Sequence, residues 1–430
     1  MVADSDTRWK WGASVALQIA PDHALDAYFL RTRATPTERQ LAEIGVVPDS
    51  RRDVSTIELL DDERLVSADL LVLATAGGTT LSILHCLGLN WAGLEHRPIT
   101  VTGYVGVVYE KLVDGLLTRA GSDLVLANSA YDAARFREAF RGVGGDQESV
   151  VEAALPFLED EEPYDPSPAG RGRTFTVCFA VQPSVPRTKR ARLLLLERVA
   201  AHARRHPERL VLMKLRSLPG EHTTHVEAHP YQKLMGQLEE PAPPNLQLVY
   251  GNMGEILDRT DLLVTVSSTA ALESLHRGIP TAILTDFGVR EAHGNHYFTH
   301  SGCLTSWSEI DEGHLPAPNP GWTADQGIGK SDPYAAARRR IAALRAAGPL
   351  PAPSPYYTPE RASFYLPELL ARHGLDEKAR PLPTSRTDGA GARGLLVRRL
   401  RRLLRPWAKG LYRFGYQRVA PALRRWGGQL

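Results

Sequence analysis

The sequence predicts an α/β protein built from two successive doubly wound, Rossmann-like domains and a basic helical tail. Short apolar runs, typical of buried parallel strands, alternate with longer amphipathic stretches that are typical of helices. Residues 159–173, which are rich in Pro, Gly and charge, interrupt this alternation, and it then begins again. Because that composition suits a linker, we expect one domain on each side of it. A chain of 430 residues is long enough for both cores.

In the first half, four apolar runs are predicted strands: 54–60, 69–75, 98–104 and 122–128. The predicted helices cover 79–89, about 107–119 and about 130–142, and Ser129 has the chemistry of an N-cap for the last of them. Only Met1–Ala3 precede the motif Asp4-Ser5-Asp6, whereas a typical strand has about five or six residues. Either the first strand is therefore unusually short, or Met1 is not the true start, or the strand is displaced to 13–19.

In the second half, five apolar runs are predicted strands: 174–180, 209–215, 246–250, 261–266 and 281–285. The predicted helices cover 187–205, about 269–277, 333–346 and 359–373, and Gly278 follows the second of them as a C-terminal cap. These elements divide the chain into an N-terminal domain (1–165), a C-terminal domain (171–330), closing helices (331–380) and a basic tail (381–430).

Charge and cysteine content exclude several classes of protein. The tail carries twelve Arg and Lys and one acid, whereas residues 1–380 carry 39 basic and 48 acidic residues. The body is therefore no general polyanion binder, and we expect no nucleic-acid partner. The cysteines, Cys86, Cys178 and Cys303, form neither a disulfide framework nor a CxxC metal site. With no apolar run of about 18 residues and no signal-peptide pattern, we expect a cytoplasmic protein.

The most informative stretch is 260–280, where a strand, a Ser-Ser-Thr turn and a helix follow one another. Ser267, Ser268 and Thr269 place three hydroxyls beside the unpaired N–H groups at the positive end of the helix, which suits a phosphate. Glu273 lies about one turn later on the side of Thr269, where its carboxylate is suited to ribose hydroxyls. The alternative is that Ser268 only caps the helix and that Glu273 is a solvated helix residue.

Lys214 and Arg216 follow another predicted strand, at the edge where doubly wound sheets bind ligands. Their charges suit a diphosphate or a nucleoside monophosphate, although two exposed charges leaving a strand have the same pattern. Gln182 follows the first strand of this domain and is expected to approach the same ligand. The nearby histidines lack a convincing metal-ligand spacing, so neither a metal nor a cofactor is predicted. These histidines are His293, His296 and His300.

Residues 267–273, Ser-Ser-Thr-Ala-Ala-Leu-Glu, resemble the nucleotide-binding part of GT-B glycosyltransferases, most of all the capsule-polysaccharide and polysialyltransferase-like enzymes. Asp-Ser-Asp (4–6), Lys-Leu-Arg (214–216) and Asp-Phe-Gly-Val (286–289) occur in the same order in uncharacterised glycosyltransferases of high-GC bacteria. The resemblance covers roughly residues 3–305. The Lys-x-His-Pro motif of related sialyltransferases is not matched, since Lys214 is followed by His229-Pro230 only fifteen residues later.

This resemblance implies two domains that face each other across a cleft, with a nucleotide sugar on the C-terminal domain and the acceptor on the N-terminal domain. It also implies that 13–19 are helical. Asp286 is then expected to face the cleft as a donor contact, and the alternative is a plain turn residue. GT-B enzymes use helix dipoles and basic residues, and not a bound metal, to stabilise the departing phosphate.

Asp4 and Asp6 are the predicted catalytic residues, with Asp6 preferred. At the end of a short first strand, a carboxylate is suited to take the proton of the acceptor hydroxyl, although both residues also fit solvated turn aspartates. Gly77 and Gly78 allow close approach of an acceptor, or equally of a packed side chain. Tyr104 is a further acceptor-binding candidate. NAD and ATP are poorly supported, because the segment 75–80 has neither the GxGxxG pattern nor a Walker lysine.

These features predict a glycosyltransferase that moves a sugar from a nucleotide sugar to a cell-surface glycan or lipid-linked acceptor without a bound metal. Two alternatives stay open. A sugar-nucleotide 2-epimerase of the same fold would turn over a UDP-sugar without any acceptor. A non-catalytic surface-glycan assembly protein would bind glycan and turn over no nucleotide sugar.

The tail predicts contact with an anionic membrane surface through 393–426. In this segment, leucines and one tryptophan recur at helical spacing on one face, and arginines occupy the flanks and the opposite side. The apolar positions are Leu396, Leu400, Leu403 and Trp407. This pattern suits an enzyme held on the inner face of the membrane. The alternatives are a helix packed on the acidic body and a disordered basic tail.

Overall fold

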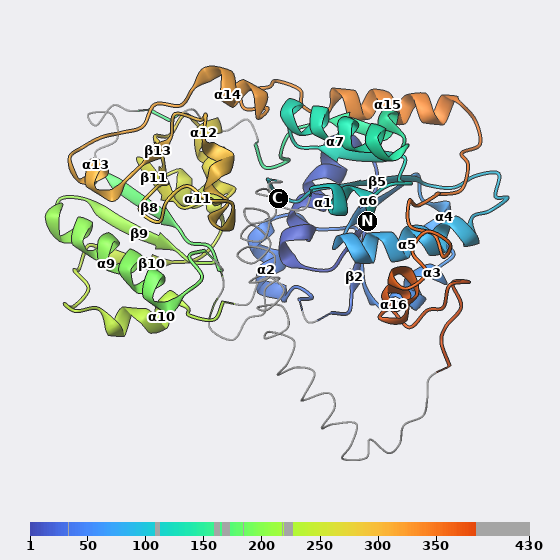
Figure 1. Ribbon diagram of the computed structural model, residues 1–430, viewed down its shortest axis with the longest axis horizontal. Coiled ribbons are helices and arrows are strands. Elements are labelled where there is room, and N and C mark those ends of the chain that lie inside the picture. The colour runs from blue at the N-terminus through green and yellow to red at the C-terminus, as the bar shows by residue number, and fades with distance from the viewer. Residues whose placement is uncertain are drawn as a thin grey trace, which may run out of the picture. The chain divides into compact units, whose positions relative to one another are not determined.

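The computed structural model describes residues 1–32, 34–107, 112–158, 164–165, 173–183, 185–216, 218 and 227–383. Within the compact unit Met1–Pro381, the chain forms two parallel β-sheets, each covered by helices (Figure 1). The predicted fold class, two doubly wound α/β domains, is confirmed. The predicted linker lies mostly outside the described residues, and the amphipathic segment 393–426 lies wholly outside them.

The N-terminal sheet has seven parallel strands in the order β3-β2-β1-β4-β5-β6-β7. The strands are β1 (Val2–Ala3), β2 (Asp26–Leu30), β3 (Ser50–Val54), β4 (Leu70–Ala74), β5 (Ile99–Gly103), β6 (Leu124–Ala127) and β7 (Val150–Glu152). Val2 in β1 pairs with Tyr28 on one side and with Leu73 on the other. The direction of winding therefore reverses between β1 and β4, which is where open α/β sheets bind their ligands.

The C-terminal sheet has six strands in the order β10-β9-β8-β11-β12-β13. The strands are β8 (Thr176–Ala180), β9 (Leu210–Lys214), β10 (Leu246–Val249), β11 (Leu262–Thr265), β12 (Thr281–Leu284) and β13 (Leu304–Thr305). Here the winding reverses between β8 and β11, which pair in parallel from Leu262–Val177 to Thr265–Ala180. Each sheet thus has its own topological switch point.

Helices connect the strands and cover both faces of each sheet (Figure 1). Those of the first half are α1 (Asp6–Ile19), α2 (Glu38–Ile44), α3 (Thr56–Leu60), α4 (Arg64–Ser67), α5 (Gly77–Asn90), α6 (Leu112–Leu117) and α7 (Ala130–Val143). The later ones are α9 (Lys189–Arg205), α10 (Tyr231–Leu234), α11 (Met253–Leu257), α12 (Ala270–His276), α13 (Trp307–Asp311), α14 (Pro320–Asp325), α15 (Ala335–Ala346) and α16 (Tyr365–Ala371).

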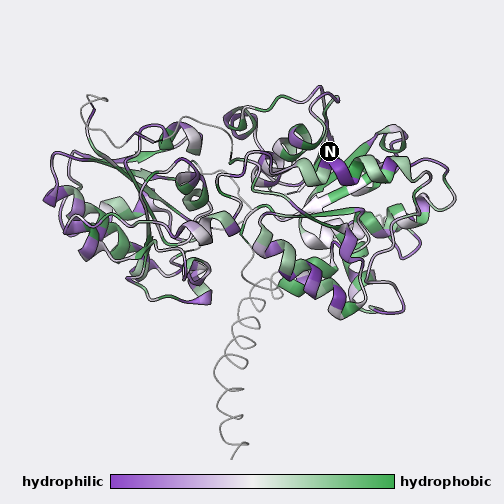
Figure 2. Ribbon diagram, turned by 90° about the horizontal axis from the view of Figure 1, so that it is seen from above, coloured by the Kyte–Doolittle hydropathy of each residue, from purple (hydrophilic) through white to green (hydrophobic). Residues whose placement is uncertain are grey.

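The cores lie between the sheets and these helices, and in Figure 2 the apolar colouring follows the strands and the inner faces of the helices. Trp9 and Trp11 of α1 are both buried in the N-terminal core, and the Trp9 and Phe29 rings are 5.1 Å apart. Burying two tryptophans on one short helix anchors the segment that directly follows the Asp4-Ser5-Asp6 motif. The start of α1 is therefore held firmly against β1 and β2.

The predicted closing helices complete the N-terminal domain. Tyr334 and the α15 residues Ala337 and Ile341 share one buried cluster with the tryptophans of α1. Leu366 and Leu369 of α16 pack with Leu81 of α5 in another cluster. The chain thus returns after the second sheet to cover the first one, which brings residues from its two ends into one domain.

One predicted strand is wrong. The apolar run 54–60 was expected to be extended, but only Val54 belongs to a strand, and Thr56–Leu60 form helix α3. The reason is a capping box, since the Ser55 side chain accepts a hydrogen bond from the Glu58 N–H while the Glu58 side chain accepts one from the Ser55 N–H. This local hydrogen bonding outweighs the apolar composition of the run.

The start of the chain forms the short strand, and 13–19 belong to a helix, as the resemblance implied. β1 has only two residues, and α1 begins at Asp6. The Ser129 N-cap is confirmed, because its side chain accepts a hydrogen bond from the Asp132 N–H at the start of α7. Gly278 directly follows Arg277, the C-cap residue of α12, and has a φ of +76°, the left-handed conformation in which helices commonly end.

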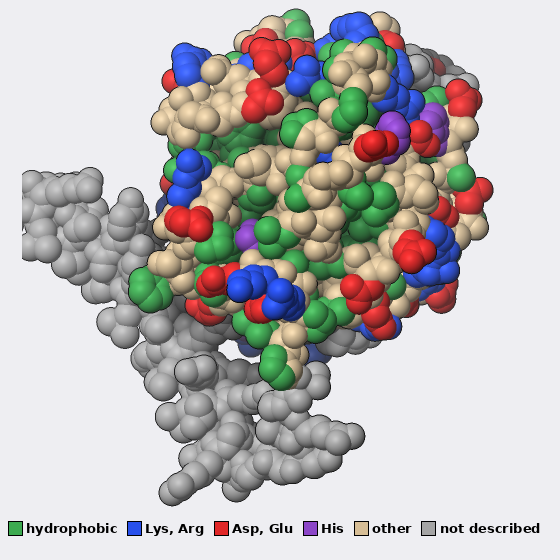
Figure 3. Space-filling model, turned by 90° about the vertical axis from the view of Figure 1, so that its right-hand side faces the viewer, with side chains coloured by type: hydrophobic (Ala, Val, Ile, Leu, Met, Phe, Trp, Pro, Cys, Tyr) green, Lys and Arg blue, Asp and Glu red, His purple; other side chains and the backbone are tan. Residues whose placement is uncertain are grey.

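Among the described residues, no helix combines the length and the apolar character that crossing a membrane requires. On the face shown in Figure 3, acidic and basic side chains are interspersed. That face therefore presents no field of one sign.

Candidate functional site

The two predicted catalytic aspartates lie at the N-terminal switch point, but they differ in how their oxygens are used. Asp4 is buried, and its Oδ1 accepts a hydrogen bond from Arg8 Nη1 at 2.7 Å. Its Oδ2 accepts another from the Ala76 N–H at 2.9 Å, which ties β1 to the turn after β4. Asp4 therefore holds the two strands of the switch point together.

Asp6 is the more accessible of the pair. It is the first residue of α1, its side chain is 18% exposed, and Thr7 Oγ1 donates to its Oδ1 at 3.2 Å. Its Oδ2 lies 3.7 Å from Arg216 Nη2, and the same guanidinium group donates a hydrogen bond to Thr7 Oγ1. The structure thus brings a predicted catalytic residue of the first half and a predicted donor-binding residue of the second half into contact.

A second contact of this kind joins α1 to α12. Lys10 Nζ lies 3.9 Å from Glu273 Oε2 and 4.7 Å from the centre of the Phe157 ring. The Glu273 side chain is only 11% exposed. The loop after β5 also reaches α12, since a Cβ at Gly106 would lie 3.1 Å from Thr269 Oγ1. The start of α12 therefore lies against elements of the first half.

Ser267 and Gln182 lie at the C-terminal switch point and satisfy one another. Gln182 Oε1 accepts from the Ser267 N–H at 2.9 Å, and Gln182 Nε2 lies 3.0 Å from Ser267 Oγ. Ser267 is buried, and its hydroxyl also donates to the His293 carbonyl oxygen. This pair fixes the turns that follow β8 and β11.

The two residues after Ser267 are partly exposed. Ser268 Oγ accepts a hydrogen bond from the Ala270 N–H at 3.3 Å, so it caps the first turn of α12. Thr269 makes no side-chain cap. These two hydroxyls are therefore the accessible part of the predicted phosphate site, whereas Ser267 already hydrogen-bonds to Gln182 and to the His293 carbonyl oxygen.

Lys214 and Arg216 leave the end of β9 with different environments. The ammonium group of Lys214 donates to the Leu215 carbonyl oxygen at 2.8 Å. Burial lowers the pKa of Lys214, and the Glu43 carboxylate of α2 acts in the opposite direction. Arg216 is more exposed, at 29% of its side chain. Two cationic groups therefore follow β9, one partly withdrawn from solvent and one paired with α1.

Asp286 follows β12, and its Oδ2 accepts a hydrogen bond from the Trp307 N–H at 3.2 Å. This contact holds the first residue of α13, and burial raises the pKa of the Asp286 carboxyl group. The side chain thus joins the segments that follow the neighbouring strands β12 and β13. This hydrogen bond gives Asp286 a structural role that needs no ligand, as in the alternative that it is a plain turn residue.

The predicted acceptor residues are packed within the N-terminal domain. A Cβ at Gly77 would lie 2.5 Å from Thr118 Oγ1, and one at Gly78 would lie 3.0 Å from Leu369. Tyr104 donates to the Leu112 carbonyl oxygen at 3.2 Å, and the buried Arg119 lies 4.2 Å above its ring. Tight packing, the alternative to acceptor approach, therefore accounts for both glycines.

Sequence reasoning missed Thr7, Arg8 and Lys10, which all contact predicted site residues. One signal for Lys10 was available. Residues four apart lie on the same face of a helix, so a helix starting at Asp6 carries Lys10 on the face of that aspartate. The partners Arg216 and Glu273 are more than 200 positions away, and no local pattern indicates them.

Among the described residues, one group has the composition of a metal site: His202, His206 and Asp311, whose ligand atoms lie within 4.8 Å of one another. His202 Nδ1 and Asp311 Oδ1 are 2.6 Å apart and join α9 to α13. None of the predicted donor or catalytic residues belongs to this group, and neither does any of the three histidines from 293 to 300.

The comparisons with known proteins bear on this arrangement. The family model described as "Putative glycosyltransferase (DUF6716)" matches residues 1–344. The chain belongs to this family. Its membership agrees with the glycosyltransferase class predicted from the sequence. No curated protein matches the chain.

Several solved structures are similar to this chain at low sequence identity, and the two with a TM-score of 0.50 share its fold. The S. aureus MnaA–UDP co-structure has a TM-score of 0.50 and 12% identity, covering 79% of this chain and 94% of that one. The crystal structure of a putative UDP-N-acetylglucosamine 2-epimerase from Listeria monocytogenes also has a TM-score of 0.50 and 12% identity, covering 80% and 96%. The glycosyltransferase SnogD from Streptomyces nogalater has a TM-score of 0.39 and 15% identity, covering 80% and 98%.

Proposed function

We propose that this protein transfers a sugar from a nucleotide-sugar donor to a cell-surface glycan or lipid-linked acceptor, without a bound metal. The single observation that carries the proposal is the pairing of Asp6 with Arg216, 3.7 Å apart. It brings a carboxylate suited to act as a base next to a cation suited to bind a phosphate. Both groups also follow strands at the carboxyl edges where doubly wound sheets bind ligands.

The donor is proposed to bind at the second switch point. Lys214, Arg216 and the Ser268 and Thr269 hydroxyls would hold its phosphates, with Gln182 and Ser267 fixing the turns behind them. Glu273 would bind ribose hydroxyls from the first turn of α12. Asp286 is the least supported member of this set, because the Trp307 N–H already engages it. Cations and hydroxyls held in place before the reaction stabilise the charge that develops on the leaving phosphate.

Asp6 is proposed as the base. The acceptor hydroxyl oxygen attacks the anomeric carbon, the bond from that carbon to the donor phosphate breaks with its electrons going to the phosphate, and the hydroxyl proton passes to Asp6. Asp4 would support this step by positioning, since Arg8 and Ala76 occupy its oxygens. Gly77, Gly78 and Tyr104 would shape the acceptor side of the N-terminal domain.

A nucleotide panel tests this proposal. UDP, GDP, CMP and dTDP are added separately to the full chain, and the melting temperature is recorded. One nucleotide is expected to raise it, because a ligand that binds only the folded state stabilises that state. If none of the four changes the melting temperature at millimolar concentration, the donor site is wrong.

A sugar-nucleotide 2-epimerase is the second candidate, because the Listeria protein with which this chain shares its fold is described as a putative enzyme of that kind. Incubation with the UDP-sugar in the absence of any acceptor separates the two. An epimerase converts the sugar to its 2-epimer, whereas a transferase leaves its configuration unchanged. A non-catalytic assembly protein would leave the sugar nucleotide intact under all conditions.

The basic tail is proposed to hold the protein at the inner face of the membrane, close to a lipid-linked acceptor. The support is its sequence, with leucines on one helical face and arginines around them. Each arginine near an anionic surface contributes about 1 kcal/mol of attraction. The full chain is expected to sediment with anionic vesicles at low salt, and a chain ending at Arg380 is not. Equal sedimentation of both would remove this role from the tail.

The finer resemblances, to uncharacterised glycosyltransferases of high-GC bacteria and to capsule-polysaccharide and polysialyltransferase-like enzymes, also stay proposals that rest on the sequence motifs. In such enzymes the product is a surface polysaccharide, which agrees with the proposed acceptor. A CMP-sugar donor would be the specific consequence for a polysialyltransferase-like enzyme, so the response to CMP in the nucleotide panel tests it directly.

A further inference from the structure

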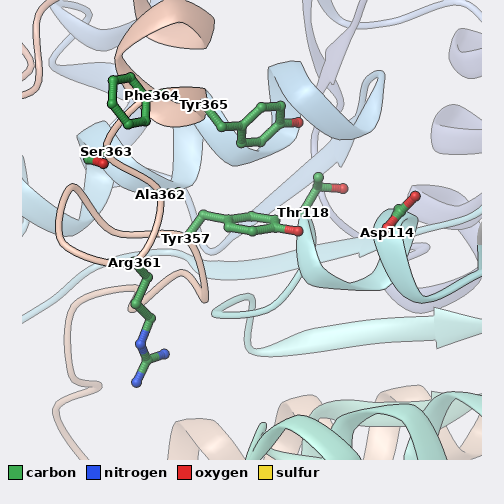
Figure 4. Close-up of a pocket in the computed structure, with 8 residues that line it drawn as sticks. All are labelled: Asp114, Thr118, Tyr357, Arg361, Ala362, Ser363, Phe364 and Tyr365. Atoms are coloured by element: carbon green, nitrogen blue, oxygen red, sulfur yellow. The ribbon is translucent and has the colours of Figure 1, made fainter.

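A cavity of about 540 Å³ lies in the N-terminal domain, apart from the residues predicted from the sequence (Figure 4). Asp114 of α6 and the following Thr118 form one side of it, and residues 357–365 form the other. The two sides are far apart in the sequence. They meet because α16 packs on α5 and brings the preceding segment with it.

Tyrosine rings form the wall contributed by 357–365. The centres of the Tyr357 and Tyr365 rings are 5.3 Å apart with an angle of 62° between the planes, and Tyr356 packs edge-on against Tyr357. In Figure 4, the Tyr357 and Tyr365 side chains extend toward Thr118, whereas Phe364 points away. Tyr357 also contacts the buried cluster of Leu366 and Leu370, so this wall is anchored in the core.

The opposite wall supplies hydrogen-bonding groups. No hydrogen bond or ion pair engages the Asp114 carboxylate within the described part of the chain. Asp114 and Tyr357 both line the cavity, and burial together with the nearby Asp114 carboxylate raises the pKa of Tyr357. Thr118 Oγ1 donates to the Gly115 carbonyl oxygen at 2.7 Å, and a hydroxyl oxygen that donates can still accept a hydrogen bond. Both groups therefore accept hydrogen bonds, as hydroxyl-rich ligands require.

The cavity is connected through α5 to the proposed reaction edge. Thr118 Oγ1 lies against Gly77, where a Cβ would be only 2.5 Å away. The residue before Gly77, Ala76, donates its N–H to Asp4. The cavity wall is therefore one contact away from the start of α5, and the start of α5 is bonded to the aspartate motif.

The charge of the lining favours an uncharged ligand. Arg361 is already held by Tyr356, since its guanidinium lies 5.3 Å above that ring and Nη1 donates to the Tyr356 carbonyl oxygen at 3.4 Å. The Arg361 guanidinium keeps its positive charge, so Asp114 and Arg361 give the lining one charge of each sign and no net charge, which favours an uncharged ligand over phosphates and acidic sugars. A lipid chain would leave the carboxylate and the tyrosine hydroxyls without partners. A sugar ring offers an apolar face to the tyrosines and hydroxyl donors to Asp114 and Thr118.

We propose that this cavity is an acceptor subsite that binds an uncharged sugar residue of the acceptor glycan, with the sugar ring packed on Tyr357 and Tyr365 and its hydroxyls bonded to Asp114. The proposal rests on the proposed transferase function, and it names the part of the acceptor that the N-terminal domain recognises.

The test uses the fluorescently labelled full chain on a printed array of neutral and anionic oligosaccharides. The wild-type protein is expected to retain neutral oligosaccharides in preference to anionic ones. The double variant Asp114→Ala, Tyr365→Ala is expected to bind the retained neutral glycans at least tenfold more weakly. Both side chains are exposed, Tyr365 at 47%, so folding is expected to survive. Tyr131→Ala, at a tyrosine 49% exposed on α7, is the matched control and should bind like the wild type.

Nucleotide binding, measured by calorimetry on the same variants, separates this proposal from the proposed function. If the wild type binds nucleotide and the double variant retains the glycans as strongly as the wild type does, the subsite alone is overturned. The same holds if the wild type retains no neutral oligosaccharide or prefers anionic ones. Loss of glycan retention in the double variant with unchanged nucleotide binding supports the subsite, and absence of nucleotide binding in the wild type overturns the proposed function instead.

Discussion

The carboxyl edges of the two sheets, at and beside the switch points, present polar groups at equivalent positions, but with opposite chemistry. After β1, the chain presents carboxylates, Asp4 and Asp6, and after β9 and β11 it presents cations and hydroxyls. In both domains the group closest to the sheet is buried and satisfied by the protein, as Asp4 is by Arg8 and Ala76 and as Ser267 is by Gln182. The accessible group comes one or two residues later, where Asp6 and Ser268 lie.

In both turns, the polar residue nearest the strand stabilises the fold, whereas the residue one or two positions later is accessible to a ligand. A polar group at the very end of a strand is desolvated by the neighbouring turns. Its burial costs free energy unless it hydrogen-bonds to partners within the protein. One or two residues later the chain has left the sheet, and a side chain remains accessible. Substitutions at the two kinds of position should therefore have different consequences, for stability at the first and for binding or transfer at the second.

The largest effect is expected for Asp6→Asn. This change keeps the shape of the side chain but removes the proposed base, so transfer should fall by roughly a hundredfold or more. Nucleotide affinity, measured by calorimetry, should be unchanged. Transfer measured with a radiolabelled sugar nucleotide checks the prediction, and near-normal rates would move the base to Asp4 or Asp286.

Asp4→Asn is expected to act on stability first. It weakens two hydrogen bonds to a buried carboxylate, from Arg8 and from the Ala76 N–H, and bonds to charged groups contribute about 1.5–3 kcal/mol each. The free energy of unfolding in urea should fall by about 2 kcal/mol. Asp6→Asn is the control, because a partly exposed ion pair contributes only about 0–1 kcal/mol. Equal losses in both variants would contradict the different roles of the two aspartates.

For the donor side, Ser268→Ala combined with Glu273→Ala should weaken nucleotide binding at least tenfold, which is about 1.4 kcal/mol. The variant removes one accessible hydroxyl and the proposed ribose acceptor, while Ser267 and the turn it fixes stay intact. Calorimetry provides the measurement. Glu255→Ala, at an exposed acid in the first turn of α11, should bind the nucleotide like the wild type. Unchanged affinity in the double variant would remove the donor assignment.

The smallest effect concerns pH. Burial lowers the pKa of Lys214, so its ammonium group loses its proton at a lower pH than an ordinary lysine does. Nucleotide affinity should therefore fall as the pH rises through that lowered pKa, by about two- to fivefold if the ion pair is worth up to about 1 kcal/mol. Lys214→Arg stays charged and should flatten this alkaline limb. An identical pH profile in the variant would show that Lys214 does not bind the phosphate.

Much of the fold could be predicted, because strand burial and helix caps are local. The strands of the second sheet from β8 to β12 all lie within predicted runs, and the Ser129 cap follows from its own chemistry. The apolar composition of residues 54–60 predicts a strand, whereas the Ser55–Glu58 capping box within the same run stabilises a helix. Strand β13, with two residues, is too short to give a periodic signal.

Less of the candidate site could be predicted. Residue type and position after a strand indicated Asp6, Lys214, Arg216 and the Ser267–Thr269 turn. They did not indicate that Ser267 hydrogen-bonds to Gln182 or that the Trp307 N–H hydrogen-bonds to Asp286. They also did not indicate that Thr118 packs against Gly77. Each of these depends on a partner many positions away, and a sequence pattern carries no information about such distances.

The sequence alone specified two doubly wound domains and a hydroxyl-rich turn with cations nearby, because strand periodicity, glycine caps and residue chemistry act over a few positions. The tertiary structure decided which of these groups are accessible and which are occupied. It paired Asp6 with Arg216 and Lys10 with Glu273, and it brought the tyrosines of 356–365 over α6. The reason is that burial and pairing depend on packing between segments hundreds of residues apart, as when α16 covers α5 near the other end of the chain.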